Sequence, residues 1–419
     1  MEKSGSSRRS FLGWANGLVA ASGLAAGSEA ALAKPKTEEG EDYYDKLGVT
    51  KIINAAGTYT ALTASIMPAS VQAAVARAAK SPVRLSQLQQ KAGEYIAQKL
   101  RCEAALVSAG AASALTLGTA ACITHANRAA ARALPTDMAG LKNEVIVQKA
   151  HRYGYDHALR NCGITFVEVE TLDDCEKAFT DRTVMTHFFN AAEEGKISRE
   201  DWVRVAHAHG VPAMNDAAAD VPPISNLWNY TQMGFDLVIF SGGKGLRGPQ
   251  NAGLLLGKKE LIEAAAINNS PNDEAVGRGM KVAKEQIIGM VAAIDWFTSQ
   301  TDEGLEAEFH KKAERVAAEL KGVPTVECTI AKPNTAANAV PHLIVRYDQQ
   351  KIKMAPRAIS AELRRGTPSI ELNPATGSRR SAGLPSDENC IVVGVWMLQE
   401  GEDAIVGKRL REVMKQASA

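Results

Sequence analysis

Three absences narrow the class of protein to which this sequence belongs. Neither charge sign is in excess, since 48 lysine and arginine residues are balanced by 47 aspartate and glutamate residues. Binding to nucleic acid depends on a surplus of basic side chains, so we expect no nucleic-acid partner. The six cysteines lack Cys-x-x-Cys spacing, and we expect no metal. Disulfide formation is an alternative in an oxidising compartment, but the simpler interpretation is that the cysteines serve as small buried apolar residues. We find no internal repeat.

The weakly apolar stretch near the N-terminus is typical of a targeting segment. Residues 7–12 read SRRSFL, a twin-arginine signature, and residues 14–26 follow with low polarity. Small residues at 31–33 offer a cleavage site, so we predict a signal peptide over residues 1–33. The prediction implies passage through the twin-arginine export machinery and a periplasmic location; the alternative is a disordered basic tail. The apolar stretch is too short to span a membrane comfortably, so no membrane span is expected in the mature chain.

A lysine surrounded by glycines follows a buried stretch. Residues 236–240 (DLVIF) indicate a strand, and residues 241–250 (SGGKGLRGPQ) place Lys244 just beyond it. Burial disfavours the charged form of lysine. The neutral amine is a nucleophile that forms a Schiff base with a carbonyl compound or with pyridoxal phosphate. Taken alone, the pattern also fits a phosphate-binding loop.

An acidic residue upstream makes the pattern more specific. Residues 211–214 (VPAM) indicate a strand that places Asp216 at its carboxyl end, the edge where open parallel sheets bind ligands. Lys244 follows 28 residues later, which allows one helix and a return strand. A carboxylate beneath a pyridine nitrogen keeps that nitrogen protonated and makes the ring an electron sink. The alternative is a helix-capping aspartate and an unrelated surface lysine.

Strand and helix patterns alternate over the first two thirds of the chain, which predicts a doubly wound parallel sheet. Helices are expected at residues 68–80 and 86–100, a surface loop at 128–142, and no regular structure at 54–60. The expected strands are residues 104–107, 144–148, 164–169, 183–188, 211–215, 236–240 and 253–256. A smaller α/β region is expected to follow, with strands at 325–330, 342–347 and 370–372 and a terminal helix at 401–417.

These motifs resemble those of the fold-type-I pyridoxal phosphate enzymes. The resemblance is to the branch that contains bacterial selenocysteine synthase (L-seryl-tRNA(Sec) selenium transferase) and D-glucosaminate-6-phosphate ammonia-lyase. It extends from about residue 53 to the end and includes NAAG at 54–57, SAGAA at 108–112, GRGMKVAKE at 277–285 and LQEGE at 398–402. It implies pyridoxal 5'-phosphate as cofactor and an α/β fold with a seven-stranded, mostly parallel sheet. The expected divisions are an arm (34–60), a large cofactor-binding domain (61–285) and a small domain (286–419).

The resemblance implies the catalytic roles. Lys244 would form the Schiff base with the cofactor, and Asp216 would contact the ring nitrogen. His151 would stack on the ring and can relay protons. His157 and Tyr153 are alternatives for that position.

The same resemblance implies cofactor-binding residues. Backbone N–H groups of a small-residue helix start would bind the phosphate, where the helix dipole is favourable. Ser241 would add a hydroxyl, Asn190 would bond the phenolic oxygen, and Ala218 would pack on the ring. The predicted helix start comprises Gly110, Ala111 and Ala112. Some relatives in the aminotransferase class V group have a polar residue at the position of Ala219. The phenolic oxygen of the ring is therefore expected to depend more on Asn190.

Basic residues are expected to bind anionic groups. Lys281, or its neighbour Arg278, would complete the phosphate site of a second subunit. Arg247 and Arg364 are candidates for a substrate carboxylate or phosphate, and Arg365 is an alternative. Because sites of this family are built across a subunit interface, we expect a homodimer or a higher homo-oligomer.

The expected reaction is an α,β-elimination on a small amino acid with a hydroxyl or another leaving group at its β-carbon, of the ammonia-lyase or dehydratase type. Lys244 would remove the α proton. Aminotransferase, racemase and aldolase chemistry stay open. Transfer to tRNA is disfavoured, because the charge is balanced, export would separate the protein from tRNA, and we expect no N-terminal tRNA-binding domain. A non-enzymatic scaffold is disfavoured by the presence of Asp216 and Lys244.

Overall fold

The computed structural model describes residues 41–190, 195–376, 383–385, 388 and 390–418. The chain divides into two compact units, Met1–Thr50 and Lys51–Ala419. The described part of the first unit holds helix α1 (Tyr43–Leu47), which Asp42 caps at its start and left-handed Gly48 at its end. The predicted signal peptide over residues 1–33 lies outside the described residues. In the part of the chain that is described, no helix combines the length and apolarity needed to cross a membrane.

The second unit is built around a seven-stranded sheet in the order β2-β8-β7-β6-β5-β3-β4. Strand β8 runs antiparallel to both neighbours, and the other pairings are parallel. The predicted seven-stranded, mostly parallel sheet is therefore confirmed. Its strands are β2 (Ala104–Ser108), β3 (Glu144–Gln148), β4 (Thr165–Val169), β5 (Thr183–Phe189), β6 (Ala213–Asp216), β7 (Leu237–Ser241) and β8 (Gly253–Gly257).

Helices cover both faces of this sheet because successive strand residues point to opposite sides. In β7, Leu237 and Ile239 enter one core cluster, whereas Val238 and Phe240 enter the other. The first cluster includes α4 (Ala111–Thr124), α6 (Asp156–Arg160) and α10 (Lys259–Ile267), and α5 (Arg128–Ala133) packs on α4. The second includes α3 (Leu85–Leu100), α7 (Leu172–Lys177), α8 (Arg199–Ala208), α9 (Asn226–Met233) and α11 (Lys284–Thr298).

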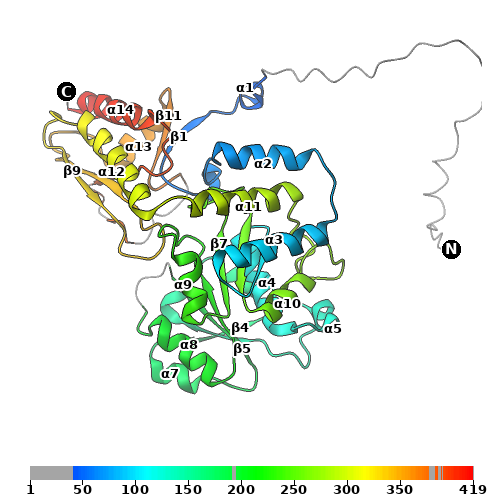
Figure 1. The fold of residues 1–419 in the computed structure, drawn as a ribbon. Coiled ribbons are helices and arrows are strands. Elements are labelled where there is room, and N and C mark those ends of the chain that lie inside the picture. Colours follow the sequence, from blue (N-terminus) through cyan, green and yellow to red (C-terminus); the bar gives the residue numbers. More distant parts are fainter. Residues whose placement is uncertain (1–40, 191–194, 377–382, 386–387, 389, 419) are drawn as a thin grey trace, which may run out of the picture. The chain divides into compact units, whose positions relative to one another are not determined.

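Helix α2 (Ala69–Ala79) lies beside α11, although the two are far apart in the sequence (Figure 1). The predicted helices at 68–80 and 86–100 are confirmed as α2 and α3. Cys122, Cys162 and Cys175 are buried in the core clusters, as predicted for small apolar residues.

The C-terminal part contains a separate antiparallel sheet in the order β12-β10-β9, which confirms the predicted smaller α/β region. Helices α12 and α13 pack on this sheet, and α14 packs on these two helices (Figure 1). The elements are β9 (Glu327–Ala331), β10 (His342–Arg346), β12 (Cys390–Gly394), α12 (Asp302–Glu319), α13 (Pro356–Arg365) and α14 (Glu402–Ala417). The boundary near residue 285 stays a prediction.

Two local predictions are wrong. Residues 52–55, expected to be irregular from residue 54 on, form β1 (Ile52–Ala55), because distant β11 (Ser369–Leu372) supplies a parallel partner. The short 3-10 turn η1 (Thr60–Leu62) follows. The expected loop at 128–142 begins with α5, because Asn127 accepts hydrogen bonds from the backbone nitrogens of Ala129 and Ala130.

Candidate active site

Three strands of the large sheet end at one edge. Strand β6 ends at Asp216 and its parallel neighbour β7 ends at Ser241. Gly253, the first residue of β8, pairs with Ser241 on one side and with Ser108 at the end of β2 on the other. The carboxyl ends of β2, β6 and β7 therefore meet, which is the place where open α/β sheets bind ligands.

The turn after β7 carries Lys244 and is packed tightly against neighbouring backbone. The nitrogen of Gly242 donates to the carbonyl of Ala252 at 2.8 Å, and that of Gly248 donates to the carbonyl of Gly242 at 2.7 Å. A Cβ on Gly245 would lie 2.0 Å from the carbonyl oxygen of Val221. Glycine next to the lysine is therefore a packing requirement.

Helix α4 starts directly on this sheet edge. Its N-cap, Gly110, has a φ of 87°, and the helix begins at Ala111. A Cβ on Gly253 would lie 2.5 Å from the carbonyl carbon of Gly110 and 2.7 Å from the nitrogen of Ala111. Because the first N–H groups of a helix have no partner within it, this close approach presents backbone donors to the edge.

These groups line one cavity of about 840 Å³, here called the lysine cavity. Its lining contains seven of the residues predicted for the site: Gly110, Ala111, Ala112, Asp216, Ala218, Ser241 and Lys244. It also contains residues that the sequence analysis did not single out, among them Tyr155, Phe189, Asp220 and Asn338. The last of these comes from the C-terminal half, and its backbone nitrogen donates to the carbonyl of Ala219 at 2.8 Å.

The two central groups have shifted pKa values. Burial lowers the pKa of Lys244, and the charges of Asp216 and Asp220 offset part of this. Burial raises the pKa of Asp216, whereas hydrogen bonds from the Tyr153 hydroxyl and the Ala218 nitrogen and the charge of Lys244 lower it. The lowered pKa of Lys244 increases the fraction of its amine that is neutral and nucleophilic at physiological pH.

Asp220 is a second buried carboxyl in the lysine cavity. Its Oδ2 accepts from Asn190 Nδ2 at 2.8 Å and from the Tyr230 hydroxyl at 3.1 Å. Burial, together with the charge of Asp216, raises the pKa of Asp220 to about 7 against the lowering effect of these hydrogen bonds. The sequence analysis did not single out Asp220. Its position four residues after Asp216, in an otherwise apolar stretch, is the sequence feature that points to it.

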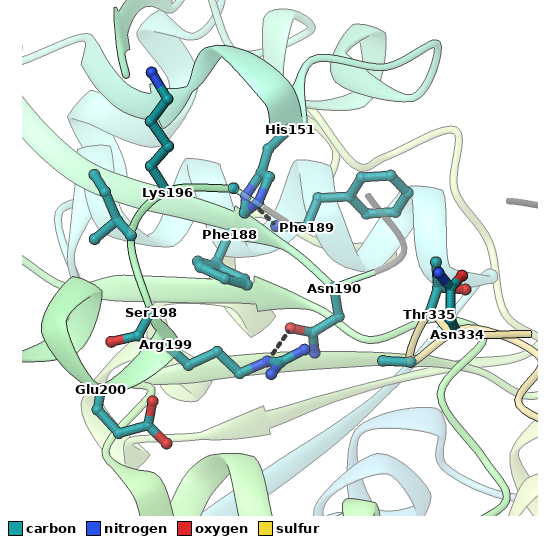
Figure 2. A pocket seen from close by; sticks show the side chains of 13 residues that line it. His151, Phe188, Phe189, Asn190, Lys196, Ser198, Arg199, Glu200, Asn334 and Thr335 are labelled. Atoms are coloured by element: carbon teal, nitrogen blue, oxygen red, sulfur yellow. Dashed lines mark hydrogen bonds between the residues drawn. The ribbon is translucent and has the colours of Figure 1, made fainter. Parts of the chain in front are cut away.

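His151 lies in a second cavity of about 1000 Å³, here called the histidine cavity, and not in the lysine cavity. It ends the short turn η2 (Lys149–His151). Its Nδ1 accepts from the Phe189 nitrogen at 3.3 Å, and its ring meets Phe188 edge-on with centroids 4.4 Å apart (Figure 2). Burial, aided by the charge of Arg199, lowers the pKa of His151 to about 4. The ring-stacking role of His151 stays a prediction, and Tyr153, the alternative, donates a hydrogen bond to Asp216.

Asn190 also lines the histidine cavity, and both ends of its amide have partners. Its nitrogen donates to Asp220, and its oxygen accepts from Arg199 Nε at 2.7 Å (Figure 2). The amide is thus held between the carboxyl group of Asp220 and the guanidinium of Arg199. The predicted contact of Asn190 with a cofactor oxygen stays a prediction, and the structure shows that Asn190 binds Asp220.

The predicted basic residues line neither cavity. Arg247 donates to the carbonyl of Ile66 at 2.9 Å and lies over the ring of Trp296. Arg364 binds Glu371 with two hydrogen bonds of 2.8 and 2.9 Å, so its guanidinium fork is already used. The alternatives Arg278 and Arg365 pair with Asp273 and Glu362. Lys281 is exposed, and its role toward a second subunit stays a prediction.

The lysine cavity fits pyridoxal 5'-phosphate. A phosphate matches the backbone donors at the start of α4 and the Ser241 hydroxyl, and an aldehyde matches the amine of Lys244. A pyridine nitrogen matches the carboxyl of Asp216, and Ala218 leaves room for a flat ring. Among the described residues, no cluster of three or more histidine, cysteine, aspartate or glutamate side chains is arranged to hold a metal.

Sequence comparisons agree with this geometry. Residues 123–367 match the model of the aminotransferase class-V family. The chain is 28% identical over 387 residues to D-glucosaminate-6-phosphate ammonia lyase of Salmonella typhimurium, covering 90% of this chain and 98% of the relative. It is 28% identical over 343 residues to a 5'-C-glycyluridine monooxygenase-decarboxylase of Streptomyces, covering 78% and 83%. An L-seryl-tRNA(Sec) selenium transferase of Aquifex aeolicus is 26% identical over 249 residues, 51% of this chain and 52% of that protein.

Solved structures share the fold. The structure of D-glucosaminate-6-phosphate ammonia-lyase superposes with a TM-score of 0.76 at 26% identity, covering 91% of this chain and all of that chain. The serine palmitoyltransferase of Sphingomonas wittichii superposes with a TM-score of 0.53 at 12% identity over 88% of each chain, which supports the fold alone. The chain therefore belongs to the aminotransferase class-V family and is a pyridoxal phosphate-dependent enzyme of fold type I.

Proposed function

We propose that this enzyme catalyses an α,β-elimination on an amino acid with a leaving group on its β-carbon, releasing ammonia and a 2-oxo acid. The observation that carries the proposal is the placement of Lys244 and Asp216 in one cavity at the carboxyl edge of the sheet. The similarity to an ammonia lyase over 98% of that relative's length supports elimination as the reaction type. A 2-amino-3-hydroxy acid is the substrate class that fits it.

In this proposal the residues of the lysine cavity divide the work of holding the cofactor. Lys244 would attach it through Nζ, and Asp216 would pair with its ring nitrogen; both line the cavity. Backbone N–H groups of Ala111 and Ala112 and the hydroxyl of Ser241 would bind its phosphate. When bound, pyridoxal phosphate supplies an electron sink that stabilises the negative charge left on the substrate α-carbon after proton removal.

Lys244 is also the base in the proposed reaction. Its free amine would take the proton from the substrate α-carbon. An amine accepts a proton near neutral pH only if it is not already protonated, so the burial that lowers the pKa of Lys244 makes this step possible. Asp216 stabilises the opposite charge on the ring nitrogen.

The test is a product assay with cofactor-loaded protein. The enzyme is incubated with D- and L-serine, D- and L-threonine, D-glucosaminate and its 6-phosphate, with no amine acceptor. We expect ammonia and a 2-oxo acid in equal amounts from at least one of these. If product forms only after a 2-oxo acid acceptor is added and no ammonia appears, the reaction is amine transfer. Inversion of the α-carbon without ammonia would favour racemisation, and release of an aldehyde would favour aldol cleavage.

Export to the periplasm through the twin-arginine machinery is part of the proposal. It is supported by the SRRSFL signature at residues 7–12. Cell fractionation of the full chain and of the double variant Arg8→Lys/Arg9→Lys tests it. The wild type should be found in the periplasmic fraction and the variant in the cytoplasm; an unchanged distribution would reject the export route.

We also propose that the active protein is a homo-oligomer of at least two chains. It is supported by the exposed Lys281, which lines neither cavity of its own chain. Light scattering coupled to size exclusion gives the mass in solution. A monomer with full activity would contradict the proposal.

A further inference from the structure

Asp220 has a carboxyl oxygen that the described part of the chain leaves without a hydrogen-bond partner. The residue is 1% exposed and lines the lysine cavity. Its Oδ1 is buried and accepts no hydrogen bond from a described residue. A buried polar atom without a partner is costly unless a ligand supplies one. Because Asp220 lines the cavity that fits cofactor and substrate, a bound molecule in this cavity is the hydrogen-bond partner that we infer for Oδ1.

The surroundings of Asp220 determine which of its oxygens carries a proton. Arg199 Nε can only donate, so the Asn190 oxygen must face Arg199 (Figure 2). The Asn190 NH₂ group must therefore face Asp220. Tyr230 donates to the same Oδ2 of Asp220. Since Oδ2 already accepts two hydrogen bonds, the proton of the acid form sits on Oδ1.

The acid form is populated at neutral pH. Burial and the neighbouring Asp216 favour it, whereas Asn190, Tyr230 and the charge of Arg199 favour the carboxylate. The balance places the pKa of Asp220 at about 7. Lys244 also interacts electrostatically with Asp220. A carboxylic acid that stays protonated near pH 7 can act as a proton donor in a reaction.

We propose that Asp220 is the acid that protonates the leaving group of the substrate from Oδ1. This inference rests on the proposed elimination. For a β-hydroxy substrate, the bond between the β-carbon and oxygen breaks with its electron pair going to oxygen, and that oxygen takes the Oδ1 proton and leaves as water. Asp220 becomes a carboxylate and recovers a proton from Lys244, which took one from the α-carbon. The proton balance closes without another reagent.

A pair of substrates that differ in the leaving group tests this role. Hydroxide needs a proton to leave, whereas chloride does not, and serine and 3-chloroalanine are otherwise alike. In Asp220→Asn, kcat/KM for serine should fall by about 10²–10⁴-fold, the usual contribution of a general acid, while kcat/KM for 3-chloroalanine changes far less. An equal loss for both substrates, or no loss for serine, would overturn the proposal.

Asp236→Asn is the matched control. Asp236 is also buried, but its Oδ2 accepts from the Ala213 nitrogen at 2.8 Å and contacts His207 Nε2 at 2.9 Å, and it lines neither cavity. Any effect of this control should be equal for serine and 3-chloroalanine. Equal circular dichroism and equal visible absorbance of bound cofactor in wild type and Asp220→Asn would show that the variant folds and loads.

Infrared difference spectroscopy gives a readout that does not depend on turnover. Wild type minus Asp220→Asn should show the carbonyl stretch of a protonated carboxylic acid at pH 6, and the band should vanish as the pH rises through about 7, the pKa of Asp220. Absence of the band at pH 6 would overturn the proposal. If wild type releases ammonia from no substrate in any assay, the elimination itself fails, and the infrared band still reports the protonation of Asp220.

Discussion

The two neighbouring cavities share Phe189 but are lined by different kinds of residue. The lysine cavity is lined by small residues at the start of α4 and by the ends of β6 and β7, with Lys244, Asp216 and Asp220 as its ionisable groups apart from Tyr155. The histidine cavity is lined by larger side chains, among them Phe188, Asn190 and Arg199.

This difference separates reacting groups from groups that hold them in place. In the lysine cavity, small side chains leave space for a ligand and expose backbone donors, and one oxygen of Asp220 still lacks a protein partner among the described residues. In the histidine cavity, His151 accepts from the Phe189 nitrogen, and Asn190 binds both Arg199 and Asp220. We therefore assign chemistry to the first and positioning to the second.

The largest expected effect is that of Lys244→Ala. Activity should fall by at least about 10⁴-fold, because the lysine is both the attachment point and the base. The visible absorbance band of the bound cofactor should also disappear. Lys311→Ala, an exposed lysine on α12, is the matched control and should keep both. A band that persists in Lys244→Ala would place the attachment point elsewhere.

Gly253→Ala tests whether close backbone packing builds the phosphate site. The new Cβ would meet the carbonyl carbon of Gly110 at 2.5 Å, so the start of α4 must shift. Cofactor affinity should fall by about tenfold or more, which corresponds to at least about 1.4 kcal/mol of binding free energy. Fluorescence titration of apoprotein with pyridoxal phosphate measures it. Gly154→Ala is the control, since a Cβ there meets nothing within 4 Å. Unchanged affinity in Gly253→Ala would move the phosphate away from α4.

Tyr153→Phe and His151→Gln compare the two cavities directly. The Tyr153 hydroxyl lowers the pKa of Asp216 by donating to it, so its removal raises that pKa. Because the reaction needs the Asp216 carboxylate, the acid limb of the kcat/KM profile should move to higher pH by about one unit, a typical size for such a pKa shift. His151→Gln should leave this limb in place. A shift of the acid limb in His151→Gln and not in Tyr153→Phe would support the ring-stacking role predicted for His151 from the sequence.

The smallest expected effect concerns stability at acid pH. Burial lowers the pKa of His151 to about 4 in the folded protein, against 6.5 for an unperturbed histidine. Between these values the unfolded chain binds a proton that the folded chain does not, so the free energy of unfolding falls as the pH falls. This side chain contributes at most about 1.4 kcal/mol per pH unit. Denaturant unfolding at several pH values should show a shallower dependence in His151→Gln. An identical slope would mean that His151 is protonated in the folded state.

Residues that act through their place in a local motif could be predicted from the sequence. Lys244 directly follows a buried strand, and Asp216 ends another, so the carboxyl edge of a parallel sheet brings them together. The small residues from Gly110 to Ala112 also follow a strand and start a helix. In each case the backbone path over a few residues decides where the side chain lies.

The hydrogen-bond partners of residues that depend on distant segments could not be predicted from the sequence. His151 is held by Phe189, 38 residues away, and Asn190 by Asp220, 30 residues away. Arg364 looked available for substrate, but Glu371 on the adjacent strand β11 occupies its guanidinium. Strand β1 was missed because its pairing partner, β11, lies near the other end of the chain.

The sequence by itself determined the seven-stranded sheet, the cofactor class and the pair formed by Lys244 and Asp216. The sheet and the pair follow from periodicity and from residues adjacent in the chain, which each strand end carries to the same edge, whereas the cofactor class follows from the resemblance of these motifs to a known family. Only the tertiary structure placed His151 in the lining of the histidine cavity and Asp220 in the lining of the lysine cavity. The direction of a side chain depends on hydrogen-bond partners and packing surfaces that folding brings from distant segments, and these leave no local pattern in the sequence.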